Sequence, residues 1–149
     1  MTKSKLIDFE LHPQLQADSW SVGELSLCSI RLINDQNYPW LIAVPQRPNI
    51  KDIHELSLDD RVQLNLESHA ISQVLMQLFK GHKMNIAALG NVVEQLHIHH
   101  IVRFKTDCAW PAPVWGAHPA APYTKAQAQS VIDSLRSDLT RQCANFVPC

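Results

Sequence analysis

The chain has 149 residues, the size of a single domain that buries roughly 68–70% of its unfolded surface around one hydrophobic core. Hydrophobic residues make up 46% of the chain and charged residues 18%, a composition that excludes a disordered or fibrous protein. Thirteen Lys and Arg against fourteen Asp and Glu give a net charge of −1, so we expect no binding to nucleic acid or to a membrane.

Three features of the sequence predict a cytoplasmic protein. The first residues contain no apolar segment typical of a secretory signal. The longest apolar runs, such as residues 41–44, are far shorter than the ~20 residues of a membrane-spanning helix. The four cysteines form no CxxC pair and have no regular spacing, which favours reduced thiols.

The N-terminal third of the chain predicts a short helix followed by a β-hairpin. The segment up to Val22 carries spaced apolar residues that suit a short helix. Residues 25–33 alternate along the chain as in a half-buried strand. Residues 34–37, Asn-Asp-Gln-Asn, are typical of a turn, and residues 38–44 are the expected returning strand.

A long helix is the clearest predicted element. Ser57 can cap its first turn, and apolar residues recur every fourth position as far as Phe79. Lys80 and Gly81 suit its C-terminal end.

The remaining elements complete an α+β fold, an antiparallel sheet with one long helix packed across it. Residues 84–89 and 92–104 are the expected strands, with a turn between them. Residues 109–122 are rich in Pro and Trp and predict an irregular arm. A final helix is expected over residues 124–143.

Eight histidines, twice the number of glycines, are the unusual feature of the composition. Alternate side chains of a strand share a face, so Gln95, His97 and His99 are expected to point to one side. The opposite, core-facing side chains are Leu96, Ile98 and His100. The first face thus presents a row of hydrogen-bonding groups that suits a bound anion.

Spacing alone leaves three interpretations of this row open. Ordinary sheet histidines are the weakest, because two of them share a face with a polar glutamine. A His-x-His pair on a strand can chelate zinc or iron, although no other histidine or cysteine has the spacing of a further ligand. A neutral imidazole can also act as a nucleophile and proton carrier.

The residues around the row resemble the histidine triad (HIT) family. They read NIAALGNVVEQLHIH over residues 85–99 and WPAPVWG over residues 110–116, and residues 32–45 are similar to the family's first hairpin. The family pattern is H-x-H-x-H, and Gln95 at its first position is similar to a bacterial Q-x-H-x-H branch. The resemblance implies a HIT-like domain over residues 1–116, with residues 117–149 as a helical extension of the same domain.

The resemblance implies that three residues form the catalytic set. His97 would attack the α-phosphate and form a covalent nucleotidyl-histidine that water cleaves. Its Nε2 must be unprotonated, and a backbone carbonyl that accepts from Nδ1 would hold that tautomer. His99 would contact the phosphate, and Gln95, which cannot ionise, would stand in place of the first histidine.

The resemblance also implies substrate-binding positions. Asn34 or Asp35 would hold the ribose hydroxyls, with Leu32 and Ile42 beside the base. The residues expected near the phosphate are Asn85, Gly90 and Asn91. The family needs no metal or other cofactor for this step, because histidines and amides stabilise the charge. Trp40 stands where better-known branches often have a histidine.

We therefore expect a nucleotide hydrolase or transferase that acts on a nucleotidyl ester, anhydride or phosphoramidate. HIT proteins commonly form two-fold dimers, so a homodimer is also expected, with the long helix and a flanking strand as its contact. Two alternatives come from other classes: a nucleotide-binding regulatory module with residual catalysis, and a His-x-His metal-binding protein.

Overall fold

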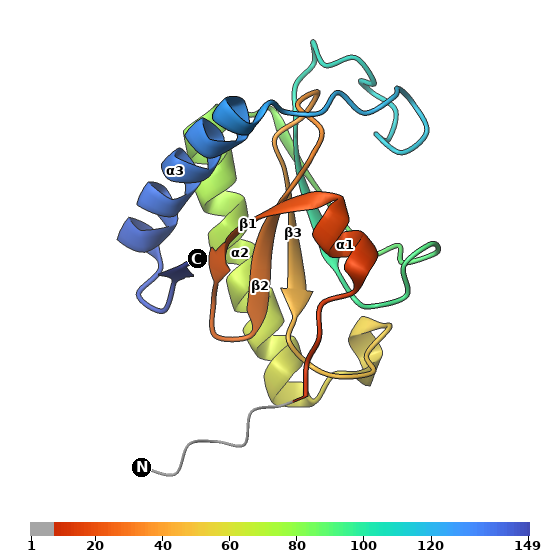
Figure 1. Ribbon diagram of the computed structural model, residues 1–149, viewed down its shortest axis with the longest axis vertical. Helices are drawn as coiled ribbons and strands as arrows, with labels where there is room; N and C mark the ends of the chain where they lie inside the picture. Colours follow the sequence, from red (N-terminus) through yellow and green to blue (C-terminus); the bar gives the residue numbers. More distant parts are fainter. Residues whose placement is uncertain (1–7) are drawn as a thin grey trace.

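The computed structural model describes residues 8–149 and shows an antiparallel sheet with helices on both faces (Figure 1). Residues 1–7, which belong to the expected domain over residues 1–116, lie outside the described residues. The six strands lie in the order β4-β5-β3-β2-β1-β6, and every neighbouring pair is antiparallel. The predicted α+β fold is therefore confirmed.

The elements have the following bounds. The strands are β1 (Ser19–Glu24), β2 (Cys28–Ile33), β3 (Trp40–Pro45), β4 (Lys83–Ala87), β5 (Ile98–Arg103) and β6 (Val147–Pro148). The helices are α1 (Pro13–Ala17), the 3₁₀ turn η1 (Ile53–Glu55), α2 (Leu58–Phe79) and α3 (Lys125–Gln142). Within residues 8–149, no helix combines the length and apolar character needed to cross a membrane.

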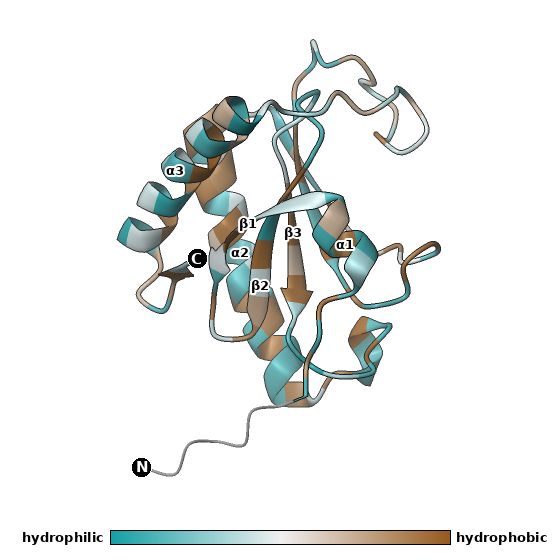
Figure 2. Cartoon of the chain, in the orientation of Figure 1, coloured by the Kyte–Doolittle hydropathy of each residue, from teal (hydrophilic) through white to brown (hydrophobic). Residues whose placement is uncertain are grey.

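The two faces of the sheet bury different side chains of the same strands. Leu41 and Ala43 of β3 point into the main core, which α2 and α3 cover. Trp40, Ile42 and Val44 point to the opposite face, toward α1 and the C-terminal arm. Hydrophobic residues accordingly fill the central strands, whereas α3 is mainly hydrophilic outside (Figure 2). Because β3 is buried on both faces, its pattern is continuously apolar rather than alternating.

The long helix begins and ends where the sequence predicts. The Ser57 hydroxyl accepts the Asp60 N–H at 3.1 Å, and Asp59 and Asp60 lie at the positive end of the helix dipole. Lys80 ends the helix in the left-handed conformation, with φ of 52°. The predicted Ser57–Phe79 helix is confirmed.

Hydrogen bonds to Glu67 hold α2 against the sheet. Its buried carboxylate accepts the backbone N–H groups of Leu27 and Cys28, both at 2.9 Å, and the amide of Gln63 at 2.6 Å. Charge-assisted hydrogen bonds of this kind compensate for the burial of a carboxylate. The β1–β2 turn is therefore held against α2.

Several predicted elements differ from the observed ones by a few residues at their ends, and two differ more strongly. The expected N-terminal helix up to Val22 is only α1, and the residues after it form β1, because the chain pairs with β2 from Ser19 onward. The strand expected over residues 92–104 begins at Ile98. The preceding residues form a loop, in which the Leu96 N–H donates to the Ile50 carbonyl rather than to a neighbouring strand.

Candidate active site

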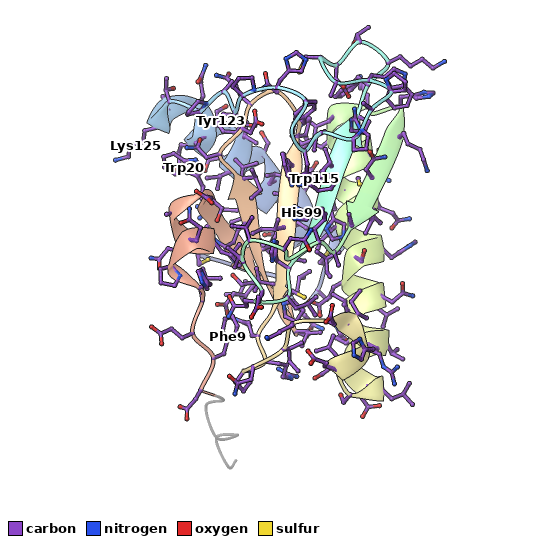
Figure 3. The ribbon with its side chains drawn as sticks, turned by 90° about the vertical axis from the view of Figure 1, so that its right-hand side faces the viewer. Phe9, Trp20, His99, Trp115, Tyr123 and Lys125 are labelled. Carbon is purple, nitrogen blue, oxygen red and sulfur yellow. The ribbon has the colours of Figure 1, made fainter. Side chains whose placement is uncertain are left out.

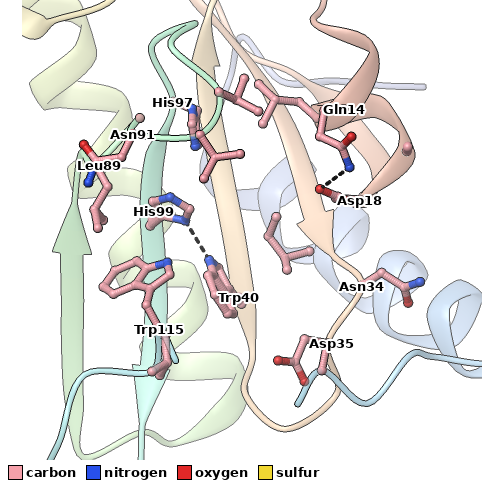
Figure 4. Close-up of a pocket in the computed structure, with 18 of the residues that line it drawn as sticks. Gln14, Asp18, Asn34, Asp35, Trp40, Leu89, Asn91, His97, His99 and Trp115 are labelled. Carbon is pink, nitrogen blue, oxygen red and sulfur yellow. Dashed lines mark hydrogen bonds between the residues drawn. The ribbon is translucent and has the colours of Figure 1, made fainter. Parts of the chain in front are cut away.

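A pocket of about 780 Å³ lies on the face of the sheet that α2 and α3 leave open (Figure 4). Its lining comes from segments far apart in the sequence: residues 14–18 in and after α1, residues 33–35 after β2, Trp40, residues 89–93, His97, His99, and residues 114–122 of the arm. Its volume is within the range of small-molecule sites. Among the described residues, the lining includes Asp18 and Asp35 but no Lys or Arg.

His97 lies just before β5, with one ring nitrogen held by the backbone. Its Nδ1 is 2.7 Å from the carbonyl oxygen of Gln95, which can only accept a hydrogen bond. Nδ1 therefore carries the proton in the neutral ring, and Nε2 has a free electron pair. The expected carbonyl acceptor at Nδ1 is confirmed, and the ring is in the tautomer that nucleophilic attack requires.

His99, on β5, has the opposite tautomer. The indole N–H of Trp40 donates to its Nδ1 at 3.0 Å, so the proton of the neutral ring is on Nε2. Burial, together with the nearby His97 and His100, lowers the pKa of His99 to about 3. His99 is thus neutral at physiological pH and presents an N–H donor.

The two imidazoles form a close pair. Their ring centroids are 4.9 Å apart in an edge-to-face arrangement, and each side chain is only 7% exposed. Among the described residues, Ser72 Oγ is the one fully enclosed side-chain N or O atom without a partner. Within residues 8–149, the Nε2 atoms of His97 and His99 have no hydrogen-bond partner and are not fully enclosed, so both are open to the pocket.

Asn34 and Asp35 lie together at the other end of the pocket (Figure 4). The Oδ1 atom of Asp35 accepts the N–H groups of Asn37 and Ala121, at 3.0 and 3.2 Å. The Oδ1 atom of Asn34 accepts the Tyr123 N–H at 2.9 Å. The segment before α3 therefore positions both residues, a contact that sequence patterns alone do not reveal.

Gly90 and Asn91 also line the pocket, on the loop between β4 and β5. Gly90 has a φ of 72°, which glycine adopts without strain, and this turns the loop toward the histidines. The structure therefore brings six of the predicted site residues together around one pocket: Asn34, Asp35, Gly90, Asn91, His97 and His99.

Gln95 and Asn85 are not part of the pocket lining, contrary to expectation. The Gln95 side chain turns to the N-terminal segment, where Oε1 accepts the His12 N–H and Nε2 donates to the Glu10 carbonyl, both at 2.9 Å. It lies in a loop, so strand alternation does not place it beside His97. The Oδ1 atom of Asn85 accepts from Arg103 at 2.9 Å, which directs this amide away from the histidines.

Neither Leu32 nor Ile42, expected beside a base, lines the pocket: Leu32 is buried in the main core, and Ile42 is buried beneath Leu15 and Val93 on the pocket-side face of the sheet. The apolar side chains that do line the pocket include Leu15 of α1, Ile33 and Val114. The alternation of β2 explains the change for Leu32, because Ile33 and Leu32 point to opposite faces of the sheet.

The Pro- and Trp-rich arm, residues 109–122, contributes an aromatic wall to the pocket. Trp115 lies beside His99 (Figure 3), edge-on, with ring centroids 5.1 Å apart, and its ring centroid is 5.9 Å from that of Trp40. Arg103 anchors the arm, because its guanidinium donates to both oxygens of Asp107, at 2.9 and 3.0 Å, and to the Ala112 carbonyl at 2.8 Å. Sequence reasoning did not place Trp40 in the site. The signal that could have found it is that a buried indole N–H needs a hydrogen-bond acceptor, which here is Nδ1 of His99.

The metal-site interpretation has little support from this geometry. Over residues 8–149, no three His, Cys, Asp or Glu side chains are grouped so that they could hold a metal ion. Each histidine of the pair also uses its Nδ1 within the protein, and the Nε2 of His99 carries a proton.

Comparisons with known proteins find one family and several solved structures that match this chain. The family model of the HIT domain matches residues 14–106. A histidine triad protein from Marinobacter aquaeolei VT8 is 48% identical, with 91% of this chain and 98% of that chain covered and a TM-score of 0.87. Histidine triad proteins from Bradyrhizobium japonicum and Sinorhizobium meliloti 1021 also match.

The Bradyrhizobium protein is 41% identical, covering 87% of this chain and 97% of that one, with a TM-score of 0.85. The Sinorhizobium protein is 39% identical, covering 89% and 98%, with a TM-score of 0.86. A search of curated proteins found no match. With the HIT domain spanning well over half of the chain and relatives of this similarity along nearly its whole length, the protein belongs to the histidine triad (HIT) family.

Proposed function

We propose that this protein is a nucleotide hydrolase or transferase in which His97 is the nucleophile. The observation that carries the proposal is the histidine pair: an unprotonated Nε2 on His97 beside an N–H donor on His99, both open to the pocket. Membership of the HIT family supports nucleotide binding and hydrolase chemistry. Free amines or thiols are not needed, because a neutral imidazole is itself a competent nucleophile.

In the proposed first step, Nε2 of His97 forms a bond to the α-phosphorus. The bond from phosphorus to the leaving group breaks, and its electron pair departs with that group. The Gln95 carbonyl, hydrogen-bonded to Nδ1–H, stabilises the positive charge that the ring gains. Water then attacks phosphorus and loses a proton to the solvent, the P–N bond breaks with its electron pair returning to Nε2 of His97, and the nucleoside monophosphate leaves.

The arrangement of the lining supports one orientation of the nucleotide in the proposed complex. With the α-phosphate at the histidine pair, Asn34 and Asp35 are placed for the ribose hydroxyls. The Nδ2 group of Asn34 and the second carboxylate oxygen of Asp35 remain available for these bonds. Gly90 and Asn91, which also line the pocket, would border the phosphate, where amide donors would stabilise its charge.

Turnover of a nucleotide panel by the wild type and His97→Ala tests the proposal. The panel contains nucleotidyl esters, anhydrides and phosphoramidates, and His69→Ala is the control, because His69 is exposed on α2 and outside the pocket lining. We expect His97→Ala to lose about 10³-fold or more in kcat, as on removal of a nucleophile. Undiminished turnover in His97→Ala would contradict the proposal, and binding without turnover in the wild type would favour a regulatory nucleotide-binding module.

We further infer that two copies of the chain associate through α2 and β4. Leu58, Val62 and Leu66 recur every fourth residue along α2 and are 67%, 54% and 58% exposed. Ile86, on β4, is 52% exposed, and β4 is an edge strand of the sheet that packs beside α2 (Figure 3). A two-fold contact would bury this apolar stripe and satisfy the free edge.

A cytoplasmic location stays a prediction from the sequence.

A further inference from the structure

The hydrogen bond between Trp40 and His99 decides which proton His99 carries. An indole N–H can only donate, so Nδ1 of His99 must accept, and the ring proton is on Nε2. His97 has the opposite arrangement, because its Nδ1 donates to the Gln95 carbonyl. The two imidazoles of the site therefore differ in tautomer, and a different partner sets each one.

The surroundings of Trp40 hold this arrangement in place. Trp40 is 8% exposed and packs in a cluster with Tyr38, Ile101, Ala109 and Val114. The Trp115 ring lies edge-on to both Trp40 and His99, so the imidazole has little room to rotate. Burial also depresses the pKa of His99 to about 3, which opposes protonation of its Nδ1.

A neutral imidazole N–H donates a hydrogen bond but does not release its proton in the physiological range. His99 can therefore stabilise negative charge without acting as an acid. The other predicted catalytic residue, Gln95, cannot ionise and points to the N-terminal segment. The histidine pair thus contains no proton to give to a departing group.

Leaving groups differ in whether they need that proton. When the bond to phosphorus breaks, the oxygen of a phosphate, carboxylate or phenol keeps the electron pair as a stable anion. The nitrogen of an amine does not, and it departs only when a proton is added. A positioned acid contributes about 10²- to 10⁴-fold to reactions that need such a transfer.

Building on the proposed function, we propose that the Trp40–His99 hydrogen bond makes the site selective for nucleotidyl aryl esters and anhydrides over phosphoramidates. In the favoured reaction, Nε2 of His97 bonds to phosphorus, the P–O bond breaks, and the oxygen leaves with the electron pair while His99 keeps its proton. Trp40 is a positioning residue in this account, because it acts through His99 and not on the substrate.

The test compares two substrates of nearly identical shape, the phenyl ester and the anilide of the same nucleoside 5′-monophosphate. The ratio of their kcat/KM values reports on formation of the adduct. We expect the wild type to favour the ester by about 10²-fold or more, the factor that a positioned acid would otherwise supply. Equal kcat/KM values for the two substrates would overturn the proposal while leaving His97 as the nucleophile.

Trp40→Phe removes the indole N–H but keeps an aromatic ring, and Trp115→Phe is the matched control, because Trp115 touches His99 without donating to its Nδ1. We expect the ester preference to narrow in Trp40→Phe and to persist in Trp115→Phe. An unchanged preference in folded Trp40→Phe would overturn the role of Trp40.

The tautomer of His99 gives a readout that does not depend on turnover. We expect ¹⁵N NMR of the wild type and Trp115→Phe to show the proton on Nε2, and Trp40→Phe to show a mixed or protonated ring. A proton on Nδ1 in the wild type would overturn the proposal even if Trp40→Phe fails to fold. Absence of turnover of every ester, anhydride and amide would overturn the proposed function, and this inference with it.

Discussion

The backbone carbonyl of Gln95 accepts the Nδ1–H of His97 at 2.7 Å, while the side chain of the same glutamine holds the N-terminal segment. Gln95 thus connects the proposed nucleophile to α1, whose residues Gln14 and Leu15 form one wall of the pocket. The side chain that stands in place of a histidine therefore has a positioning role in the structure.

Substitution of Gln95 separates this role from catalysis. Gln95→Leu removes both side-chain hydrogen bonds but keeps the backbone carbonyl that orients His97. Each bond stabilises by about 1 kcal/mol, so loosening the α1 wall is expected to raise KM by roughly 5- to 30-fold with kcat nearly unchanged. Steady-state kinetics measure the split, and hydrogen exchange of residues 8–18 should increase in parallel. A fall in kcat at constant KM would instead assign Gln95 to the chemical step.

Contact between Asn34 and the ribose is tested by removing either partner. Asn34→Ala and a 2′- or 3′-deoxy substrate should each lower kcat/KM, by about 5- to 10-fold for one hydrogen bond. Their combination should cost little more than either change alone, because both remove the same bond. Fully additive losses would show that Asn34 does not touch the ribose.

The stability of the fold should fall in mild acid because of His100. This fully buried ring donates through Nδ1 to the Ile98 carbonyl and pairs with the Ser68 hydroxyl at 2.8 Å. Burial lowers its pKa to about 4, although the bond to Ile98 acts in the opposite direction. The unfolded state therefore takes up a proton first, and stability is lost as the pH falls from about 6.5 toward 4.

The size of this loss is about 3 kcal/mol at full extent, and His99, with a pKa of about 3, adds to it in the same direction. Urea unfolding between pH 7 and pH 4 measures it. The double variant Ser68→Ala/His100→Leu fills the space of the buried imidazole with an apolar side chain. Its free energy of unfolding should therefore depend less steeply on pH. The same slope in both proteins would exclude His100 as the cause.

The apolar stripe on α2 predicts a dimer that a single charge disrupts. Val62→Glu places a carboxylate at the centre of the stripe and should convert the dimer to a monomer, as measured by light scattering after size-exclusion chromatography. Ser137→Glu adds the same charge at an exposed position of α3 and should leave the dimer intact. A wild type that is monomeric at micromolar concentration would contradict the proposed contact.

Local patterns predicted the parts of the fold that depend on local chemistry. The Ser57 cap and the apolar period gave the bounds of α2, and residues 34–37 marked the turn of the β2–β3 hairpin. Strand alternation failed for residues 92–97, because these residues follow Gly90 in a loop whose hydrogen bonds run to Ile50 and within the loop. His97 still meets His99, but Gln95 does not.

Sequence reasoning found the site residues that come from one continuous motif. It did not find those that reach the pocket through contacts between distant segments of the chain. His97, His99, Gly90 and Asn91 come from one segment and line one pocket. The wall formed by α1, the arm with Trp115 and the backbone at residues 121–123 arise from contacts between distant segments. The periodicity of apolar residues along a helix or strand does not predict contacts between distant segments, so only the structure reveals them.

The covalent chemistry is tested most directly by trapping the nucleotidyl enzyme. The wild type is mixed briefly with a nucleotidyl ester, quenched at alkaline pH and digested, and the peptides are analysed by mass spectrometry. We predict the mass of a nucleoside monophosphate residue on the peptide at His97 within the first turnover, and its absence in His97→Ala. Substrate turnover by the wild type without any adduct, or with the adduct on another residue such as His118, would contradict His97 as the nucleophile.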